Sequence, residues 1–300
     1  MKRLLFHFLC LVGPILLSIS PIDSQAQQSI FFKLNLQQGE KYQFNMHTKQ
    51  KVQQEMMGNA MTINQDIEVE YLYDILENNQ QGLHIKTTYQ RLAMHMELPQ
   101  KTLDYDSKHV NDENNPLNKL GKMMGKSFDV YISPEGKVTK VEGLRAIIDS
   151  IGSDAATQQV LAQQFSDSAF IHMMDASLNI YPNKKIRVGE SWQKNVSMPT
   201  GGMMDMSLQS TYTLNNIVND QAHIQVRSDI KLSPLASNEV TNNMEFNLTG
   251  KQTGELQTDI QSGLVSSGSL HQEINGNLSA QGFKIPMTII SDITTTGKKR

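Results

Sequence analysis

The stretch DIEVEYLYDI, residues 66–75, places apolar side chains at every second position and carboxylates between most of them. Side chains of a β-strand point alternately to its two faces, so this order predicts a strand with one dry face and one wet face. Residues 222–232, 240–248 and 283–293 repeat the alternation. Strands of this kind are typical of antiparallel sheets.

Residues typical of turns separate the alternating runs. Glycine, proline, asparagine and aspartate favour turns because they tolerate or fix the backbone angles that a turn needs. Their spacing predicts about twelve strands, joined mostly as hairpins. The predicted turns are Gln38-Gly39, Asn78 to Gly82, Pro134-Glu135-Gly136, Asn219-Asp220, Ser262-Gly263 and Asn275-Gly276.

The middle of the chain has helical spacing instead. Asn115-Pro116 begins a short helical turn, and residues 143–151 predict a second helix. Asp154 is suited to cap a third helix that runs towards Ala176. Apolar residues three or four apart predict one buried stripe along this third helix. The members of the stripe are Leu161, Phe165, Ala169, His172 and Ala176.

An internal echo indicates a duplicated design. Three short matches occur in the same order in the two halves of the chain, which is less expected by chance than a single match. Within them Trp192 takes the place of Tyr42, and we expect both rings to anchor a core. The matches pair Gly39-Glu40-Lys41-Tyr42-Gln43 with Gly189-Glu190-Ser191-Trp192-Gln193, Tyr73, Ile75, His84 and Ile85 with Tyr212, Leu214, His223 and Ile224, and Ile132 to Val138 with Ile260 to Val265.

Together these patterns predict a mainly β (α+β) fold. We expect a duplicated antiparallel β-meander that forms curved sheets or half-barrels, with a helical insert between the halves. The expected organisation is a signal peptide over residues 1–26, a first β-meander over 27–142 with a short helix near 115–125, a helical segment over 143–180 and a second β-meander over 181–300.

The first residues have the order of a secretory leader. Lys2 and Arg3 precede an apolar run from Leu4 to Ile19, and Ser24-Gln25-Ala26 supplies small residues for cleavage. The alternative is a membrane anchor, which needs about 20 consecutive apolar residues, more than this run contains. We therefore predict cleavage after Ala26 and an exported chain, periplasmic or secreted in a Gram-negative envelope, with no transmembrane segment in its mature part.

Composition excludes several classes of protein. The only cysteine, Cys10, lies in the leader, so the mature chain has no disulfide, thiolate metal site or cysteine nucleophile. Loss of the leader changes the formal charge from −3 to about −4. Scattered charges of this balance give no reason to bind nucleic acid or an anionic membrane.

Methionine is the compositional oddity, with 17 in the chain. Clusters such as Met94-His95-Met96 and Met203-Met204-Asp205-Met206 suggest copper, because thioether and imidazole ligands suit Cu(I). Strand geometry opposes this interpretation, since Met94 and Met96 continue an apolar face from which His95 turns away. We expect most methionines to line a core or an adaptable apolar pocket.

The sequence contains no recognisable catalytic motif. We find no Gly-x-Ser-x-Gly elbow, phosphate loop, His-Glu-x-x-His helix or calcium loop. A divalent ion could bind a predicted acidic loop, although a solvated loop is the simpler interpretation, and His84 and His223 fall on wet strand faces. We predict no catalytic, cofactor-binding or metal-binding residue and no cofactor, while a pair of catalytic carboxylates assembled in space stays open. The acidic loop contains Asp104, Asp106, Asp112 and Glu113.

Three motifs, together with the leader, resemble a known family. They are Gly39-Glu40-Lys41-Tyr42, Ile132-Ser133-Pro134-Glu135-Gly136-Lys137-Val138 and Val188-Gly189-Glu190-Ser191-Trp192. In this combination the chain resembles a group of exported Bacteroidota proteins that share a domain of unknown function, number 6263. The resemblance implies an envelope protein of similar size and supplies no catalytic residues.

The expected function is that of a non-enzymatic exported envelope protein that binds an apolar ligand or lipid in a concave β cleft. At the level of the fold, the expected curved sheets resemble envelope carriers that shuttle lipoproteins or lipids across the periplasm. Two alternatives stay open. One is a structural or protein-interaction component that meets another envelope protein, and the other is a copper-binding periplasmic protein.

Overall fold

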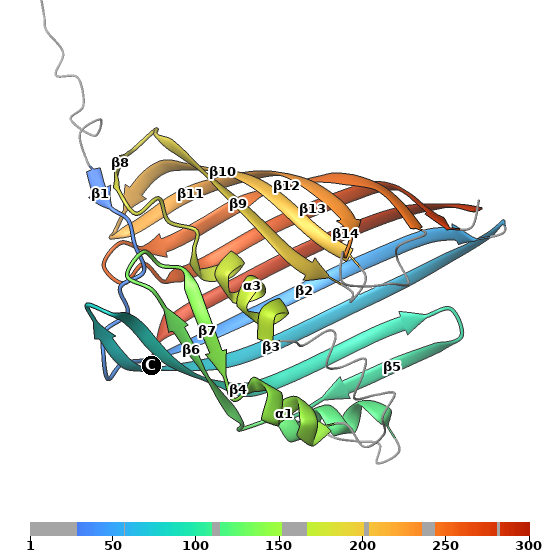
Figure 1. Cartoon of the computed structure of the whole chain (residues 1–300), viewed down its shortest axis with the longest axis horizontal. Coiled ribbons are helices and arrows are strands. Elements are labelled where there is room, and N and C mark those ends of the chain that lie inside the picture. Colours follow the sequence, from blue (N-terminus) through green and yellow to red (C-terminus); the bar gives the residue numbers. More distant parts are fainter. Residues whose placement is uncertain are drawn as a thin grey trace, which may run out of the picture.

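The computed structural model describes residues 29–56, 58–109, 115–151, 167–200, 204–235, 244–280 and 283–300. The predicted leader lies outside these ranges. The described part is mainly β, as predicted, with long antiparallel strands and few helices (Figure 1). No helix in that part is both long and apolar enough to cross a membrane.

The strands are numbered in chain order and vary from three to 21 residues in length. They are β1 (Ser29–Phe31), β2 (Lys41–Met56), β3 (Asn59–Asn79), β4 (Gly82–Leu98), β5 (Lys101–Asp106), β6 (Ser127–Ile132), β7 (Val138–Glu142), β8 (Lys185–Arg187), β9 (Ser191–Thr200), β10 (Met204–Val218), β11 (Gln221–Pro234), β12 (Met244–Asp259), β13 (Val265–Ala280) and β14 (Phe283–Lys299). The helices are η2 (Pro116–Met123), α1 (Leu144–Ile151) and α3 (Asp167–Leu178).

One sheet contains twelve of these strands, in the order β7-β6-β4-β3-β2-β14-β13-β12-β11-β10-β9, with β5 added beside β4. The strands β1 and β8 pair separately. Each predicted meander is present as neighbouring antiparallel strands. The last strand, β14, pairs with β2 from Met287–Gln54 to Lys299–Tyr42, so the two meanders form one continuous sheet.

The sequence echo corresponds to repeated local geometry. Gly39 and Gly189 both have positive φ, 81° and 88°, at the turn that precedes the first long strand of each half. Their amides donate to the carbonyl oxygens of Ile75 and Leu214, at 2.8 and 2.7 Å. These are the positions that the echo aligned.

Irregularities in the ladders are repeated as well. A register shift follows Ile75 in the pairing of β3 with β4, and another follows Leu214 in the pairing of β10 with β11. Further shifts occur at the ends of β6 and β12, next to the third match of the echo. Bulges bend and twist strands locally, so these matching shifts are a shared feature of the two halves, while the shift between Glu70 and Tyr71 of β3 has no counterpart in β10.

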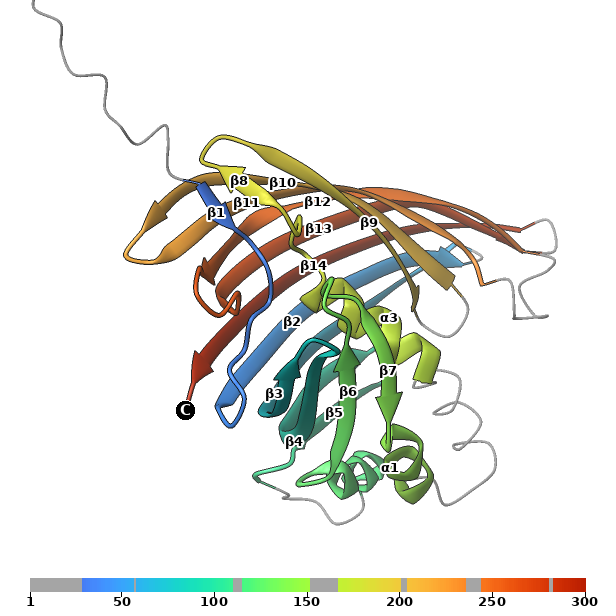
Figure 2. The same cartoon turned by 60° about the vertical axis from the view of Figure 1, so that its left-hand side comes forward.

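Alternation gives the sheet two distinct faces. We call the inner face the one towards which Tyr71, Tyr73 and Ile75 point, and the opposite one the outer face. These three side chains are at most 8% exposed, and they belong to the main core. The long strands of the sheet arch over α3 and over the β6–β7 hairpin at the sheet's own end, both of which lie on the side of the inner face (Figure 2).

Aromatic side chains hold the main core at one end of the sheet, which we call the proximal end. Trp192 stacks on Tyr212 at a centroid distance of 5.5 Å, and its indole N–H donates to the carbonyl oxygen of Ile180 at 2.7 Å. Phe32, fully buried after β1, meets Trp192 and Tyr181 edge-on. Tyr42 lies opposite Tyr73 in the first half as Trp192 lies opposite Tyr212 in the second. The prediction of two equivalent anchors is confirmed.

The helices confirm two sequence predictions and correct a third. Asn115 caps η2 by accepting a hydrogen bond from the amide of Leu117, and α1 occupies the predicted segment. In α3, however, the buried side chains are Phe170, Met174 and Leu178, while His172 is exposed. The predicted stripe is therefore wrong by two positions in the described part of this helix. Asp154, Leu161 and Phe165, from which its phase was set, lie outside the described residues.

Two predicted loops also prove to be strands. Asn275-Gly276 lies inside β13 and forms no turn. A Cβ on Gly276 would lie 3.0 Å from the Cα of Leu248, so the glycine is needed for the close approach of the neighbouring strand. Asp104 and Asp106 lie in β5, while Asp112 and Glu113 are outside the described residues.

Glycines permit the close pairing of β12 with β13. On the inner face, Gly250 lies opposite Ile274 and Gly254 opposite Leu270, while Leu256 and Leu248 lie opposite glycines of β13. Each aliphatic side chain therefore covers a glycine on the neighbouring strand. Because one residue of each facing pair has no side chain, the strands can approach closely, and glycines placed in this way allow a sheet to curve.

We predict that Gly254→Ala destabilises the fold by about 2 kcal/mol or more, because overpacking a closely fitted core has a cost of this order. A Cβ at this position would lie 2.1 Å from the carbonyl oxygen of Ser269. Urea unfolding would measure the change. Thr253→Val, on the exposed outer face of the same strand, is the matched control and should leave the midpoint unchanged. Equal midpoints for both variants would contradict the argument.

Candidate functional site

Beyond the main core, the inner face carries a second apolar cluster that we call the distal patch. Its buried centre is aliphatic, and half-buried methionine, isoleucine and phenylalanine side chains surround that centre. These outer members remain partly exposed on the concave side of the sheet. The buried members are Leu208, Ile230, Leu232, Leu248 and Ile274, and the half-buried ones are Met198, Met204, Met206, Phe246, Met287 and Ile289.

A row of polar side chains separates the distal patch from the main core. The row crosses eight neighbouring strands at one register position, and all its members belong to the inner face. Five of them are at most 8% exposed. In spatial order the polar row consists of Gln65, Gln50, Ser291, Gln272, Gln252, Ser228, Ser210 and Lys194.

The members of the polar row hydrogen-bond one another across the strands. Gln272 donates to the side-chain oxygen of Gln252 at 2.7 Å, and Gln252 donates to the hydroxyl of Ser228 at 3.1 Å. Ser228 and Ser210 share a hydrogen bond of 2.7 Å. A buried polar group is tolerated when it is bonded in this way, so the row can lie between two apolar regions.

Lys194 ends the row at the edge strand β9. Its ammonium group donates to the side-chain oxygen of Asn179, just beyond the end of α3, at 2.9 Å. Burial lowers the pKa of Lys194, and the negative charge of Asp175 opposes that effect. Asp175 itself accepts a hydrogen bond from the amide of Val138 at 2.9 Å.

From the polar row, an apolar track leads to the distal rim of the sheet along β14. Ser291 is buried, Ile289, Met287 and Ile285 are half-buried, and Phe283 is 59% exposed. These residues alternate along one strand and therefore share the inner face. The distal patch is thus continuous with solvent at this rim.

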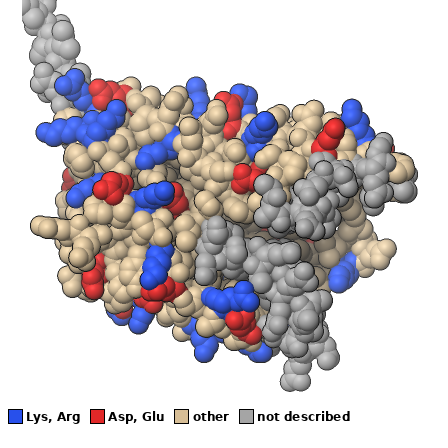
Figure 3. Space-filling view, in the orientation of Figure 1, with Lys and Arg blue, Asp and Glu red and all other residues tan. Residues whose placement is uncertain are grey.

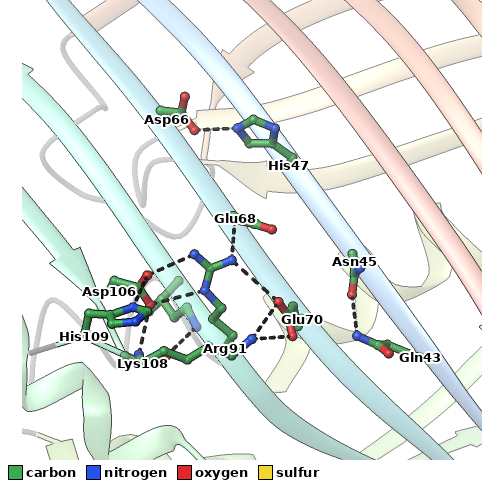
Figure 4. A network of polar contacts seen from close by, with 12 residues as sticks. Gln43, Asn45, His47, Asp66, Glu68, Glu70, Arg91, Asp106, Lys108 and His109 are labelled. Carbon is green, nitrogen blue, oxygen red and sulfur yellow. Dashed lines mark hydrogen bonds and ion pairs between the residues drawn. The ribbon is translucent and has the colours of Figure 1, made fainter.

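The outer face has the opposite character, with charged side chains of both signs. On the side of the molecule that Figure 3 shows, Lys and Arg are likewise interspersed with Asp and Glu. The largest described network of the outer face centres on Arg91, which forms two hydrogen bonds with the carboxylate of Asp106, at 3.2 and 3.0 Å, and one with Glu68 at 2.6 Å (Figure 4). Lys108 pairs with Glu70 beside it, at 3.1 Å. The Arg91 guanidinium holds the pKa of Asp106 well below its usual range.

Histidines of the outer face pair with aspartates. His47 contacts Asp66 at 2.5 Å, and His84 contacts Asp129 at 2.8 Å. The pairs His95–Asp104, His109–Asp106 and His271–Asp292 follow the same pattern. His84 and His223 lie on the outer face as predicted. Across the described ranges, no group of three His, Cys, Asp or Glu side chains is arranged to hold a metal ion.

A polar cavity of ≈ 570 Å³ lies at the proximal end of the sheet. Among its lining residues, the hydroxyl of Tyr42 donates to Glu40 at 2.5 Å, and Lys299 pairs with the same carboxylate. Burial and Glu40 raise the pKa of Tyr42 to about 12, so this phenol stays protonated at neutral pH. At this cavity Glu40 is paired with Lys299, whereas the distal patch presents partly exposed apolar side chains.

The apolar faces are predictable from the sequence, whereas the polar row is not among the sequence predictions. In the alternating series of β11 and β14, the apolar positions are interrupted once each, at Ser228 and Ser291. A serine at an otherwise apolar inner-face position is the sequence signal that could have indicated the polar row. The alignment of these serines with Gln252 and Gln272 depends on register, which the sequence alone does not state.

The fold and this face define a class of protein: an open, strongly curved antiparallel sheet whose concave face is apolar and crossed by one polar row. The chain belongs to the family of unknown function DUF6263, whose model matches residues 80–265. The resemblance seen in the sequence is confirmed at the level of the family. No curated protein matches the chain.

Among solved structures, lipovitellin is similar at 9% identity with a TM-score of 0.50, over 88% of this chain and 25% of the lipovitellin chain. The chain therefore spans about a quarter of that protein, and the likeness concerns the fold alone. A BenF-like porin from Pseudomonas fluorescens Pf-5 aligns at 7% identity over 88% of this chain and all of its own, with a TM-score of 0.23. An outer membrane channel from Pseudomonas putida F1 aligns at 6% identity over 93% of this chain and all of its own, with a TM-score of 0.20.

We predict that Gln252→Leu destabilises the protein by about 1–3 kcal/mol, because it leaves the buried amide of Gln272 without its acceptor. Gln257→Leu, on the exposed outer face of the same strand, is the matched control. Denaturant unfolding with intrinsic fluorescence would measure both variants. A stabilised Gln252→Leu variant would show that the row is not held by its hydrogen bonds.

The Arg91 network predicts a pH dependence. Because the folded-state pKa of Asp106 is depressed, its stabilising effect is full above the ordinary aspartate pKa, about 3.9, and is lost as the pH falls through the lower folded-state value. The difference in unfolding free energy between the wild type and Asp106→Asn should therefore be constant from neutral pH to about pH 5 and shrink below pH 4. Asp229→Asn, in an exposed pair with Lys251, should cost less than about 1 kcal/mol throughout.

Proposed function

We propose that this chain is a non-enzymatic exported protein that binds an apolar ligand or lipid on the inner face of its sheet. The observation that carries the proposal is the distal patch, whose outer members remain only half-buried although they lie on the concave side of the sheet. Soluble proteins rarely leave concave apolar surface uncovered unless something binds there.

The residue types of the distal patch support a ligand without a fixed shape. Four methionines, Met198, Met204, Met206 and Met287, surround the aliphatic centre. Methionine is unbranched and polarizable, so a surface lined with it adapts to flexible apolar partners. A core that served stability alone would be fully covered instead.

The likeness to lipovitellin gives further support at the level of the fold. That structure is described as showing lipid–protein interactions. The shared feature is the curved sheet, and fold alone is a weak indication of function. Export rests on the leader sequence of residues 1–26, and a periplasmic or secreted location in a Gram-negative envelope is part of the same proposal.

Copper binding is the second candidate, and one observation favours it. Met198 lies directly opposite Met206, with Met204 two residues further on the same face. Against it, the described histidines of the strands point outward, and Leu232 and Leu248 separate these sulfurs from Met287. A structural or protein-interaction role is the remaining alternative, in which the distal patch would contact another protein.

Native mass spectrometry of the mature protein from its own host's envelope, with lipid extraction of the same sample, tests the proposal. An apolar adduct that is removed by organic solvent is the expected result and would identify the ligand. A copper adduct would favour the second candidate. A bare polypeptide mass would count against both and favour the interaction role.

We predict that Met206→Glu lowers the affinity for an apolar fluorescent probe by about tenfold or more, because a carboxylate in the distal patch has to lose its water on binding. Gln209→Glu, on the exposed outer face of the same strand, is the matched control and should bind as the wild type does. Near-ultraviolet circular dichroism of Trp192 would confirm that each variant is folded. Unchanged probe affinity in folded Met206→Glu would place binding elsewhere.

A further inference from the structure

The polar row and the distal patch contain one charged side chain, that of Lys194. Among the described inner-face positions from the row to the distal ends of β2, β3 and β9 to β14, every other position is apolar, a glycine, a proline or an uncharged polar residue. No carboxylate occurs among them, so the positive charge has no partner of opposite sign on this surface.

Among the described residues Lys194 has no ion-pair partner, and the charge of Asp175 offsets the cost of its burial only in part. Its hydrogen-bond partner, the side-chain oxygen of Asn179, is neutral. Asp175 acts on Lys194 from a distance, but its carboxylate accepts from the amide of Val138 and from the side chain of Asn179, at 2.9 and 3.4 Å. A half-buried ammonium group without an ion-pair partner is costly, and proteins tend to retain one where it has a use.

The position of Lys194 relative to the distal patch gives it such a use. Val196, Met198 and Thr200 follow it on the same face of β9, and Ser210 lies beside it in the polar row. At about 3.3 Å per residue, the apolar surface from Lys194 to Thr200 extends about 20 Å. One acyl chain spans half of a bilayer's hydrocarbon core, about 15 Å, so a single chain fits this length.

We propose that the ligand of the inner face is an anionic amphiphile, whose charged head pairs with Lys194 and whose single acyl chain lies on the distal patch. This inference rests on the proposed function and adds the chemical class of the ligand. The hydroxyls of Ser210 and Ser228, next in the polar row, are bonded to each other, so the ammonium group of Lys194 is the charged donor that the described row offers to the head. The head is a carboxylate or a phosphate, since both are anions that an ammonium group binds.

Binding of three single-chain probes distinguishes the possibilities: oleate, oleoyl phosphate and oleyl alcohol. All carry the same chain, and they differ in the charge of the head. We expect the wild type to bind at least one of the two anions about tenfold more tightly than the alcohol. Displacement of an apolar fluorophore from the full mature protein would measure all three.

Variants separate the charge of Lys194 from its structural contact. Lys194→Met should lose the preference for the anion while binding oleyl alcohol as before, and Lys194→Arg should restore the preference. Lys251→Met, an exposed lysine of the outer face, is the matched control. Asn179→Ala removes the hydrogen-bond partner of Lys194 but keeps its charge, so the preference should survive.

Two failures are distinguishable. If the alcohol and the anions bind equally well, or if folded Lys194→Met keeps the preference, the anionic head is wrong and the apolar site stands. If the wild type binds none of the three probes, the proposed function falls, and this inference falls with it.

Discussion

The structure depends on the pairing of β14 with β2. Each meander by itself is a sheet of local hairpins with an unpaired edge, and neither carries the whole inner face. Thirteen register positions join the two, from Met287–Gln54 to Lys299–Tyr42. Across this junction the side chain of Gln50 donates to the hydroxyl of Ser291 at 3.0 Å, so the polar row continues from one half into the other. The concave surface is therefore a property of the joined sheet.

Because side chains alternate along the joined strands, the two faces of the sheet carry side chains of opposite polarity. The inner face contains aromatic rings, aliphatic chains and methionines, with the polar row between its two clusters. The outer face contains the Arg91 network and the histidine–aspartate pairs. Glycines opposite Ile274 and Leu270 keep the inner side thin where the sheet bends. Curvature and polarity thus follow from the same period of two residues.

Much of the fold is predictable because it is local. The alternation in residues 66–75 places Tyr71, Tyr73 and Ile75 on the buried face, and the echo identifies Trp192 with Tyr42 before any coordinates are known. The candidate site is less predictable because it depends on register between distant strands. Ser228 and Gln252 meet only through strand pairing, and Lys194 gains significance only when the inner face around it proves to be uncharged. The predicted helical phase of α3 is wrong because the members of the stripe within this helix, Ala169, His172 and Ala176, are two small residues and a polar one and define an apolar face poorly.

The junction of the two meanders also constrains how the chain reaches its native state. Gln50 and Ser291, which meet across it, are 241 residues apart in the sequence. Contacts of such separation form late, because the entropy of closing the intervening loop must first be overcome, and proteins rich in them fold slowly. Until β14 arrives, the long strand β2 presents an open row of backbone donors and acceptors to any other strand that it meets. A chain of this topology therefore exposes an unpaired strand edge for longer than one built from local hairpins alone, and such exposure favours association between unfinished chains.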